Sequence, residues 1–440
     1  MDKSNLIIKS DLMDKIIALC KRRGIIFPGS ELYGGLNGTW DLGPAGTLIA
    51  NNIKNEWRKS IIFSRDNVVE IDSSTILNPA VWNASGHIAS FTDPMIECKI
   101  CHERFRADHK NQIKEHEGMH KKTSWTEIKL FNLMFKTFVG PIDNEENKTY
   151  LRPETAQGIF INYKNVVDST RVNIPFGIAQ IGKGFRNEIT TGNFLFRVRE
   201  FEMMELEFFV KPTEAAKWHE YWRKERLNWY LSFGIKKENI KLTNLPKEDI
   251  AHYSKGTTEV WYNWPFMGFG ELEGIANRGD YDLSQHSKYS GRDLSYFDET
   301  ANEKYLPYVI EPSVGVGRAM LAFLLDSYYE DEKRIVLRLN PKLAPYKVAV
   351  FPLLANKPEL VEKAKKIYKD LSKHFVTAYD GRGNIGKRYF AQDEIGTPFC
   401  ITVDFETLEN DTVTIRDRDT MKQERIKTDK LKDYLDKILF

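Results

Sequence analysis

Charged side chains are concentrated in FRNEITTGNFLFRVREFEMMELEFF, residues 185–209, a stretch that otherwise has the apolar pattern of a buried hairpin. Side chains alternate between the two faces of a strand, so this hairpin would present two groups of polar residues on shared faces. They are Arg186 and Glu188 in the first strand, and Arg197, Arg199, Phe201, Met203 and Glu205 in the second. Guanidinium groups bind phosphate oxygens bidentately, while a ring can stack on a base and a carboxylate can accept from an amino group. The set therefore suits ATP held on an antiparallel sheet, although a salt-bridged surface is the simpler interpretation of any single arginine.

Other nucleotide-binding motifs fit the sequence less well. It contains no G-x-x-x-x-G-K-[ST] pattern. GVGRAM (315–320) has glycine at its first and third positions, but methionine where a dinucleotide-binding loop has its third small residue. We interpret this segment as a helix start that brings Arg318 near phosphate.

The composition is that of an ordinary globular protein of 440 residues, long enough for two to four domains. Its 64 basic and 62 acidic residues nearly balance, so any nucleic-acid contact must come from local patches. Four cysteines are too few for a disulfide scaffold and indicate a reduced, cytoplasmic protein. We expect no membrane association, because no apolar run approaches the ~18 residues of a membrane span.

The apolar periodicity predicts an α+β fold for residues 1–340. Predicted helices cover 11–22, 47–63, 213–233 and 317–329, and predicted strands cover 67–79, 258–276 and 306–313. Short alternating segments between 150 and 210 indicate an antiparallel sheet. Residues 97–130 are rich in Lys, His and Glu, which predicts an exposed insertion.

From residue 341 the pattern changes to a regular alternation of strand and helix, which predicts a separate α/β domain over 341–440. Its basic and aromatic residues are candidates for contacts with nucleic-acid phosphates and unpaired bases, although a surface charge or a core aromatic is the simpler interpretation of each. These residues are Arg382, Lys387, Arg388, Tyr389, Phe390, Arg416 and Arg418.

Three segments resemble the motifs of class II aminoacyl-tRNA synthetases. FRNE (185–188) with RVREF (197–201) resembles motif 2, the helix 47–63 with a strand closing at Pro79 resembles motif 1, and PSVGVGRAMLAFLL (312–325) resembles motif 3. Longer strings are similar to the dimeric glycyl-tRNA synthetase family, and the resemblance runs from about residue 10 to the C-terminus. These strings are FPGSELYGGLNGTWDLGP (27–44), LRPETAQGIF (151–160), GELEGIANRGDYDL (270–283) and YVIEPSVG (308–315).

This resemblance implies a class II catalytic domain on an antiparallel sheet flanked by helices, followed by an anticodon-binding domain with a mixed sheet. It implies a homodimer that activates glycine with ATP, aided by Mg²⁺, and transfers it to tRNA(Gly). Another class II synthetase, such as a prolyl, threonyl or histidyl enzyme, is one alternative. An inactive, synthetase-like nucleic-acid-binding subunit is another, but the ATP-binding arginines and Glu188 are all present.

The resemblance also implies roles for individual positions. Arg186 and Arg318 are the candidate catalytic residues, and Glu271 is the candidate Mg²⁺ ligand. The positions implied to bind ATP are Arg186, Asn187, Glu188, Phe196, Arg197, Val198, Arg199, Glu200, Phe201, Glu271, Leu272, Gly315, Val316, Gly317 and Arg318. Those implied to bind glycine are Arg106, Glu154, Phe201, Glu202, Met203, Met204, Glu205, Glu311, Pro312, Ser313, Val314 and Gly315.

One segment departs from the family pattern, and two pairs of Cys and His residues raise the question of a metal site. The motif 2 loop carries Thr190-Thr191-Gly192 where the family usually has a proline and a basic residue, which puts contacts with the tRNA acceptor end in doubt. Cys98-x-x-Cys101, with His102 and His109 nearby, raises the question of zinc, but we expect two partly buried thiols instead. His116 and His120 lie four residues apart in KEHEGMHKK (114–122), which predicts a polar helix face.

Overall fold

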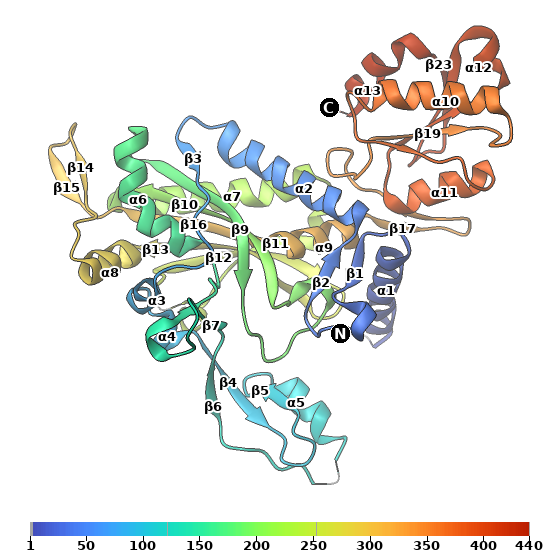
Figure 1. Cartoon of the computed structure of the whole chain (residues 1–440). Helices are drawn as coiled ribbons and strands as arrows, with labels where there is room; N and C mark the ends of the chain where they lie inside the picture. Colours follow the sequence, from blue (N-terminus) through green and yellow to red (C-terminus); the bar gives the residue numbers. More distant parts are fainter. Residues whose placement is uncertain (1–2, 121, 252, 440) are drawn as a thin grey trace.

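The computed structural model describes residues 3–120, 122–251 and 253–439 (Figure 1). Its centre is a seven-stranded sheet in the order β11-β12-β13-β16-β10-β9-β3. The strands are β3 (Val68–Glu70), β9 (Phe176–Phe185), β10 (Glu200–Val210), β11 (Ile240–Asn244), β12 (Gly256–Trp264), β13 (Gly268–Gly279) and β16 (Tyr308–Gly315). All neighbours pair antiparallel except β3, which runs parallel to β9. The predicted α+β fold on an antiparallel sheet is confirmed, with one parallel edge strand.

Helices cover both faces of this sheet. α1 (Lys3–Arg22), α2 (Pro44–Arg58), α7 (Ala215–Ser232) and α9 (Val316–Ser327) contribute to the larger core, and α6 (Ala156–Thr170) and α8 (Tyr281–Ser290) to the other. Phe208 lies in the first core and Phe209 in the second, as the alternation along a strand requires. Among the described helices, none is both long and apolar enough to cross a membrane.

The predicted helix 47–63 corresponds to α2, which continues as a π-helical turn over Lys59–Phe63. The predicted strand 67–79 is wrong beyond Glu70, because Pro79 begins a helix, α3 (Pro79–Ala84). Proline is favoured at the first helical position, and the Asn78 side chain caps the helix by accepting from the backbone of Ala80 at 2.9 Å. Pro79 therefore marks a helix start rather than a strand end.

The strands of the predicted hairpin are shorter than its charged residues suggested. β9 and β10 pair from Phe185↔Glu200 to Phe176↔Phe209, so residues 186–199 form the loop that joins them. The polar positions in this loop do not follow strand alternation: the guanidinium of Arg199 donates to the carbonyls of Asn37 and Glu188. Alternation holds only from Phe201 onward.

The insertion forms a small lobe that projects from the side of the seven-stranded sheet (Figure 1). Its sheet has the order β5-β4-β6, built from β4 (Thr92–Glu97), β5 (Arg104–Arg106) and β6 (Lys129–Asn132), with α5 (Lys110–Glu117) beside it. The predicted polar helix face is wrong for His116, whose side chain is only 4% exposed. We define this "insertion lobe" as residues 92–132.

The C-terminal part contains a mixed sheet, as the resemblance implied, with five strands in the order β20-β19-β21-β22-β23. Its strands are β19 (Val348–Pro352), β20 (Thr377–Tyr379), β21 (Phe399–Val403), β22 (Thr412–Asp417) and β23 (Gln423–Lys427). Its helices are α10 (Pro358–Leu371), α11 (Ile385–Ile395), α12 (Phe405–Asn410) and α13 (Leu431–Leu439). β23 and α12 are short and mostly exposed.

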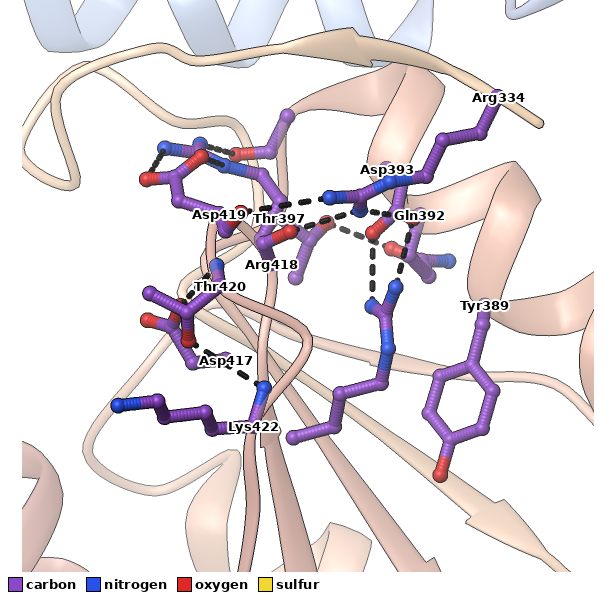
Figure 2. Close-up of polar contacts among 12 residues, drawn as sticks. Arg334, Tyr389, Gln392, Asp393, Thr397, Asp417, Arg418, Asp419, Thr420 and Lys422 are labelled. Carbon is purple, nitrogen blue, oxygen red and sulfur yellow. Dashed lines mark hydrogen bonds and ion pairs between the residues drawn. The ribbon is translucent and has the colours of Figure 1, made fainter. Parts of the chain in front are cut away.

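A buried ion cluster joins the two parts of the chain (Figure 2). Asp393 on α11 accepts from Arg334 at 2.7 Å and from Arg416 at 2.8 and 2.9 Å. Arg418 donates to the carbonyls of Leu339 and Gly396 at 2.9 and 2.7 Å. Arg388 is also buried and donates to backbone carbonyls, including that of Gly383 at 2.7 Å. The predicted contacts of Arg388, Arg416 and Arg418 with phosphates are therefore wrong, because these guanidinium groups are buried and bonded inside the protein.

Candidate active site

A cavity of about 540 Å³ opens over β10, β13 and β16, beside the 186–199 loop and the start of α9. Most of the residues proposed from the sequence line it. They are Arg106, Glu154, Arg186, Glu188, Phe196, Arg197, Val198, Glu200, Phe201, Glu202, Met203, Glu205, Glu271, Leu272, Glu311, Ser313, Val314, Gly315, Val316, Gly317 and Arg318.

Four proposed residues are not among those that line the cavity: Asn187, Arg199, Met204 and Pro312. Met204 is fully buried in the larger core, on the opposite face of β10 from Met203 and Glu205. The sequence analysis also missed lining residues from distant segments, including Asp93, Tyr253 and Glu259. Gly274 and Ala276 line the cavity too, and alternation from Leu272 along β13 could have identified them.

Three guanidinium groups give one side of the cavity a positive charge. Arg186 donates through Nε to the Pro153 carbonyl at 3.1 Å, and its terminal nitrogens bond to no described residue. Its guanidinium lies 5.4 Å from the ring centroid of Phe91 and 5.3 Å from that of Phe201. Stacking thus holds the Arg186 head group in place while its terminal nitrogens keep their capacity to donate.

Arg318 is held by a carboxylate on the neighbouring strand. Its Nη1 donates to Glu271 Oε2 at 2.8 Å, and its guanidinium lies 4.5 Å from the centroid of the Phe196 ring. Burial alone would raise the pKa of Glu271, but Arg318, with Arg186 and Arg197 behind it, lowers that pKa below its usual value. Glu271 is therefore ionised, and its side chain is 46% exposed at the cavity.

Glu188 provides an acceptor without a partner. Its Oε2 is buried and receives no hydrogen bond from a described residue. A buried carboxylate oxygen without a donor is costly, so a ligand N–H group would gain a strong bond here. Nearby, Phe201 packs over Gly184 on β9, where a Cβ atom would lie 2.6 Å from the ring. Gly184 thus leaves the space in which the ring of Phe201 lies.

Buried carboxylates form the other side of the cavity. Glu205 accepts from the backbone N–H and hydroxyl of Thr155, at the start of α6, and from the Ser313 hydroxyl at 2.8 Å. Glu311 accepts from Arg278 at 2.8 Å, and Glu154 accepts from Gln157 at 3.0 Å. Three acidic groups therefore converge where the sheet and the N-terminus of α6 meet.

The environment of Glu311 keeps a proton there near neutral pH. Burial raises the pKa of Glu311, Arg278 opposes this, and the carboxylates of Glu205 and Glu154 raise it again, to about 8. Burial also raises the pKa of Glu154, but His87 and Arg278 lower it well below its usual value. The group thus combines ionised and protonated carboxyls and can accept a small cation by releasing a proton.

The floor beside these carboxylates is made of small residues. Glu205 on β10 is paired with Ser313 on β16, which is paired in turn with Gly274 on β13, so the three lie in one row across the sheet. A Cβ atom on Gly274 would meet only Glu271 Oε1, at 4.0 Å. The space above Gly274 is therefore open for a ligand and just as open to an added methyl group.

Comparison with known families agrees with this architecture. The tRNA synthetase class II core domain (G, H, P, S and T) matches residues 135–328, and the anticodon binding domain matches residues 347–438. Glycine–tRNA ligases from Thermobifida fusca and Streptomyces coelicolor are each 52% identical to this chain, over 97% of it and 98% of their own lengths. The glycine–tRNA ligase of Caldanaerobacter subterraneus is 53% identical with the same coverage. The resemblance noted in the sequence is confirmed, and the chain belongs to the glycine–tRNA ligase family of class II aminoacyl-tRNA synthetases.

Proposed function

We propose that this chain activates glycine with ATP in the 540 Å³ cavity and transfers the glycyl group to tRNA(Gly). A glycine carboxylate oxygen attacks the α-phosphorus, the bond from that phosphorus to the β-phosphate oxygen breaks, and pyrophosphate leaves. The 3′-terminal ribose hydroxyl of tRNA then attacks the glycyl carbonyl, and AMP leaves. The observation that carries the proposal is a single cavity with guanidinium groups on one side and carboxylates over a floor of small residues on the other.

The arginine side of the cavity suits the nucleotide. Arg186 would bind the α-phosphate with its terminal nitrogens, while Arg197 and Arg318 would bind the β- and γ-phosphates. Because the attacking carboxylate is already an anion, no strong base is needed, and rate enhancement comes from positioning and from neutralising developing charge. These arginines would supply both effects.

Adenine would lie between Glu188 and Phe201. The unpartnered Oε2 of Glu188 would accept from the exocyclic amino group, and the Phe201 ring would stack on the base. Guanine has a carbonyl in place of that amino group, so it would leave Glu188 unsatisfied. The same carboxylate would thus select ATP over GTP.

Glu271 and Glu259 fit a Mg²⁺ ion, because both carboxylates line the cavity from the paired strands β13 and β12 and Mg²⁺ prefers oxygen ligands. When bound, Mg²⁺ would supply positive charge that offsets the negative charge of the phosphates. Glu271 also orients Arg318 through their 2.8 Å hydrogen bond.

The carboxylate side suits the ammonium group of glycine. Glu154, Glu205 and Glu311 would surround it. Glycine has no side chain to hold, and a single methyl contact is worth only about 1–3 kcal/mol, so selectivity must come from excluding larger amino acids. Gly274, opposite Ser313, is the floor position at which a substrate side chain would meet the sheet.

Contacts with tRNA would come from the exposed part of the C-terminal region. Arg382 is 96% exposed, and Lys387 and Phe390 are also exposed near the start of α11. The motif 2 loop, in which Thr190-Thr191-Gly192 departs from the family pattern, contacts the turn at residues 37–38, where Thr191 Oγ1 donates to Asn37 Oδ1 at 2.8 Å.

Assembly and location also belong to the proposal. A homodimer through the motif 1 region would cover Phe63, which is 71% exposed at the end of the helix. The four cysteines of the chain are all free, which suits a cytoplasmic protein.

We place the division between the catalytic and anticodon-binding domains near residue 340, between the segments that the two family models match.

Amino-acid-dependent exchange between ATP and pyrophosphate tests the activation step. Glycine, alanine, serine and proline would be compared in parallel, and we expect exchange with glycine alone. Exchange with another of these amino acids would indicate a different class II specificity. No exchange with any of them, together with binding of duplex DNA, would favour the inactive accessory protein.

A further inference from the structure

We propose that Cys98, Cys101, His116 and His120 bind a zinc ion that holds the insertion lobe together. One potential ligand atom from each of these side chains lies within 4.8 Å of all the others. A tetrahedral zinc ion with bonds of about 2.0–2.3 Å separates its ligand atoms by roughly 3.3–3.8 Å. Cys101 Sγ and His116 Nε2 already lie 3.4 Å apart, so only small side-chain adjustments are needed.

The backbone places these ligands from two separate elements. Cys98 directly follows β4, and a turn closed by the His102 N–H donating to the Cys98 carbonyl at 2.9 Å brings Cys101 beside it. His116 lies in the last turn of α5 and His120 one turn further, with their ring centroids 4.9 Å apart. The spacing is C-x2-C-x14-H-x3-H, which is typical of Cys2His2 zinc sites.

The histidines have the environment of metal ligands. Glu103 Oε2 lies 3.4 Å from His116 Nδ1, the arrangement in which a carboxylate fixes the tautomer and leaves Nε2 available for a metal. That Nε2 is the atom facing Cys101 Sγ. His120 Nε2 is buried and receives no hydrogen bond from a described residue. Phe105 and Trp125 pack against the His116 ring, with centroids 4.7 and 5.5 Å away, and shield that side of it from water.

The lobe has little else to stabilise it. Within the insertion lobe, the only buried side chains among those described are Asp93, Ile96, Cys98, Phe105 and His116. A segment this small does not form a sufficient apolar core, and such segments depend on a metal or a disulfide. Two sulfur and two nitrogen ligands favour zinc over harder cations. The sequence analysis expected two partly buried thiols and no zinc; Cys98 is buried and Cys101 is exposed. The histidines that it considered do not lie at the thiols: His102 is 75% exposed beside Glu97, and His109 contacts Gln112.

The position of the site gives it a consequence for the cavity. Arg106 lies on β5, a few residues after Cys101, and lines the cavity. Its guanidinium donates to Asp93, on β4, at 2.7 Å. The ion would therefore fix the two strands that carry this pair to the substrate.

Metal analysis of the full-length purified chain tests the site independently of catalysis. After dialysis against zinc-free buffer, elemental analysis should find about one zinc per chain. Cys101→Ser and His120→Ala, both outside the buried core, should lose that zinc, whereas His102→Asn, in the same segment, should retain it. Glu103→Gln should bind zinc about 10–100-fold more weakly in a chelator competition.

Cobalt provides a second readout in case a variant unfolds. Wild-type chain loaded with Co²⁺ should show the intense visible bands of a tetrahedral thiolate site, with the sulfur-to-cobalt absorption reduced in Cys101→Ser. The proposal would be overturned if the purified wild-type protein contained no zinc and, when loaded with Co²⁺, gave only the weak absorption of octahedral cobalt. Zinc retained at the wild-type level in both ligand variants would also overturn it.

Discussion

The floor of the amino-acid pocket can be tested by adding one methyl group at Gly274. A Cβ atom there would meet its nearest protein atom, Glu271 Oε1, at 4.0 Å, which is ordinary contact. The change should therefore leave the fold intact. With glycine bound above the row Gly274–Ser313–Glu205, the same methyl would overlap the substrate. Overpacking of this kind costs about 1–3 kcal/mol, which corresponds to a roughly 5- to 150-fold loss in kcat/KM for glycine.

The assay is ATP–pyrophosphate exchange with both substrates varied. Gly274→Ala should raise the KM for glycine while leaving the KM for ATP within about twofold of wild type, because the arginines and Glu188 are untouched. Gly256→Ala is the matched control: it adds the same methyl to neighbouring β12, outside the residues that line the cavity, with no atom within 4 Å. Unchanged glycine kinetics in Gly274→Ala, or an equal loss in the control, would refute the placement of the substrate.

Three further predictions follow from the geometry of the site and of the domain junction. Glu188→Gln should raise the KM for ATP about tenfold and reduce discrimination against GTP, measured by exchange with each nucleotide, because a charged acceptor is replaced by a neutral amide; equal kinetics would remove Glu188 from the base site. Since the pKa of Glu311 is raised to about 8, glycine binding at pH 7 must release a proton, and affinity should rise roughly tenfold per pH unit below about pH 8. Calorimetry in buffers of different ionisation enthalpy would detect this proton, and Glu311→Gln should abolish it; no release in wild type would contradict the assignment. Asp393→Asn should destabilise the chain by about 3–5 kcal/mol in urea unfolding, because Arg334 and Arg416 lose their buried partner. The exposed Asp436→Asn, which breaks a pair with Lys432, should cost under about 0.5 kcal/mol, and a similar loss in both variants would show that burial is not the cause.

The sequence predicted the site best where a local rule governs it. Strand alternation correctly grouped Phe201, Met203 and Glu205, which all line the cavity. It failed for Arg199, because β10 begins only at Glu200 and the preceding loop takes its conformation from the distant turn at Asn37. The conformation of such a loop depends on tertiary contacts, which leave no hydrophobic periodicity in the sequence from which to predict it.

Contacts between distant segments account for most of the remaining misses. Asp93 and Tyr253 reach the cavity from the insertion lobe and from the loop between β11 and β12, so neither belongs to a motif. Arg416 and Arg418 looked like surface charges because Asp393 and the carbonyl of Leu339, which hold them, lie far away in the chain. The Cys and His spacing was present in the sequence, but nearer histidines in a charged segment concealed it.

The most direct test of the central claim is the charging of unfractionated tRNA by the purified chain with ATP and labelled amino acids, glycine among them, supplied one at a time. We predict that label enters tRNA only when glycine is the amino acid, and that the charged species is tRNA(Gly). Charging with another amino acid, or glycyl-adenylate formation with no transfer to tRNA, would contradict the account.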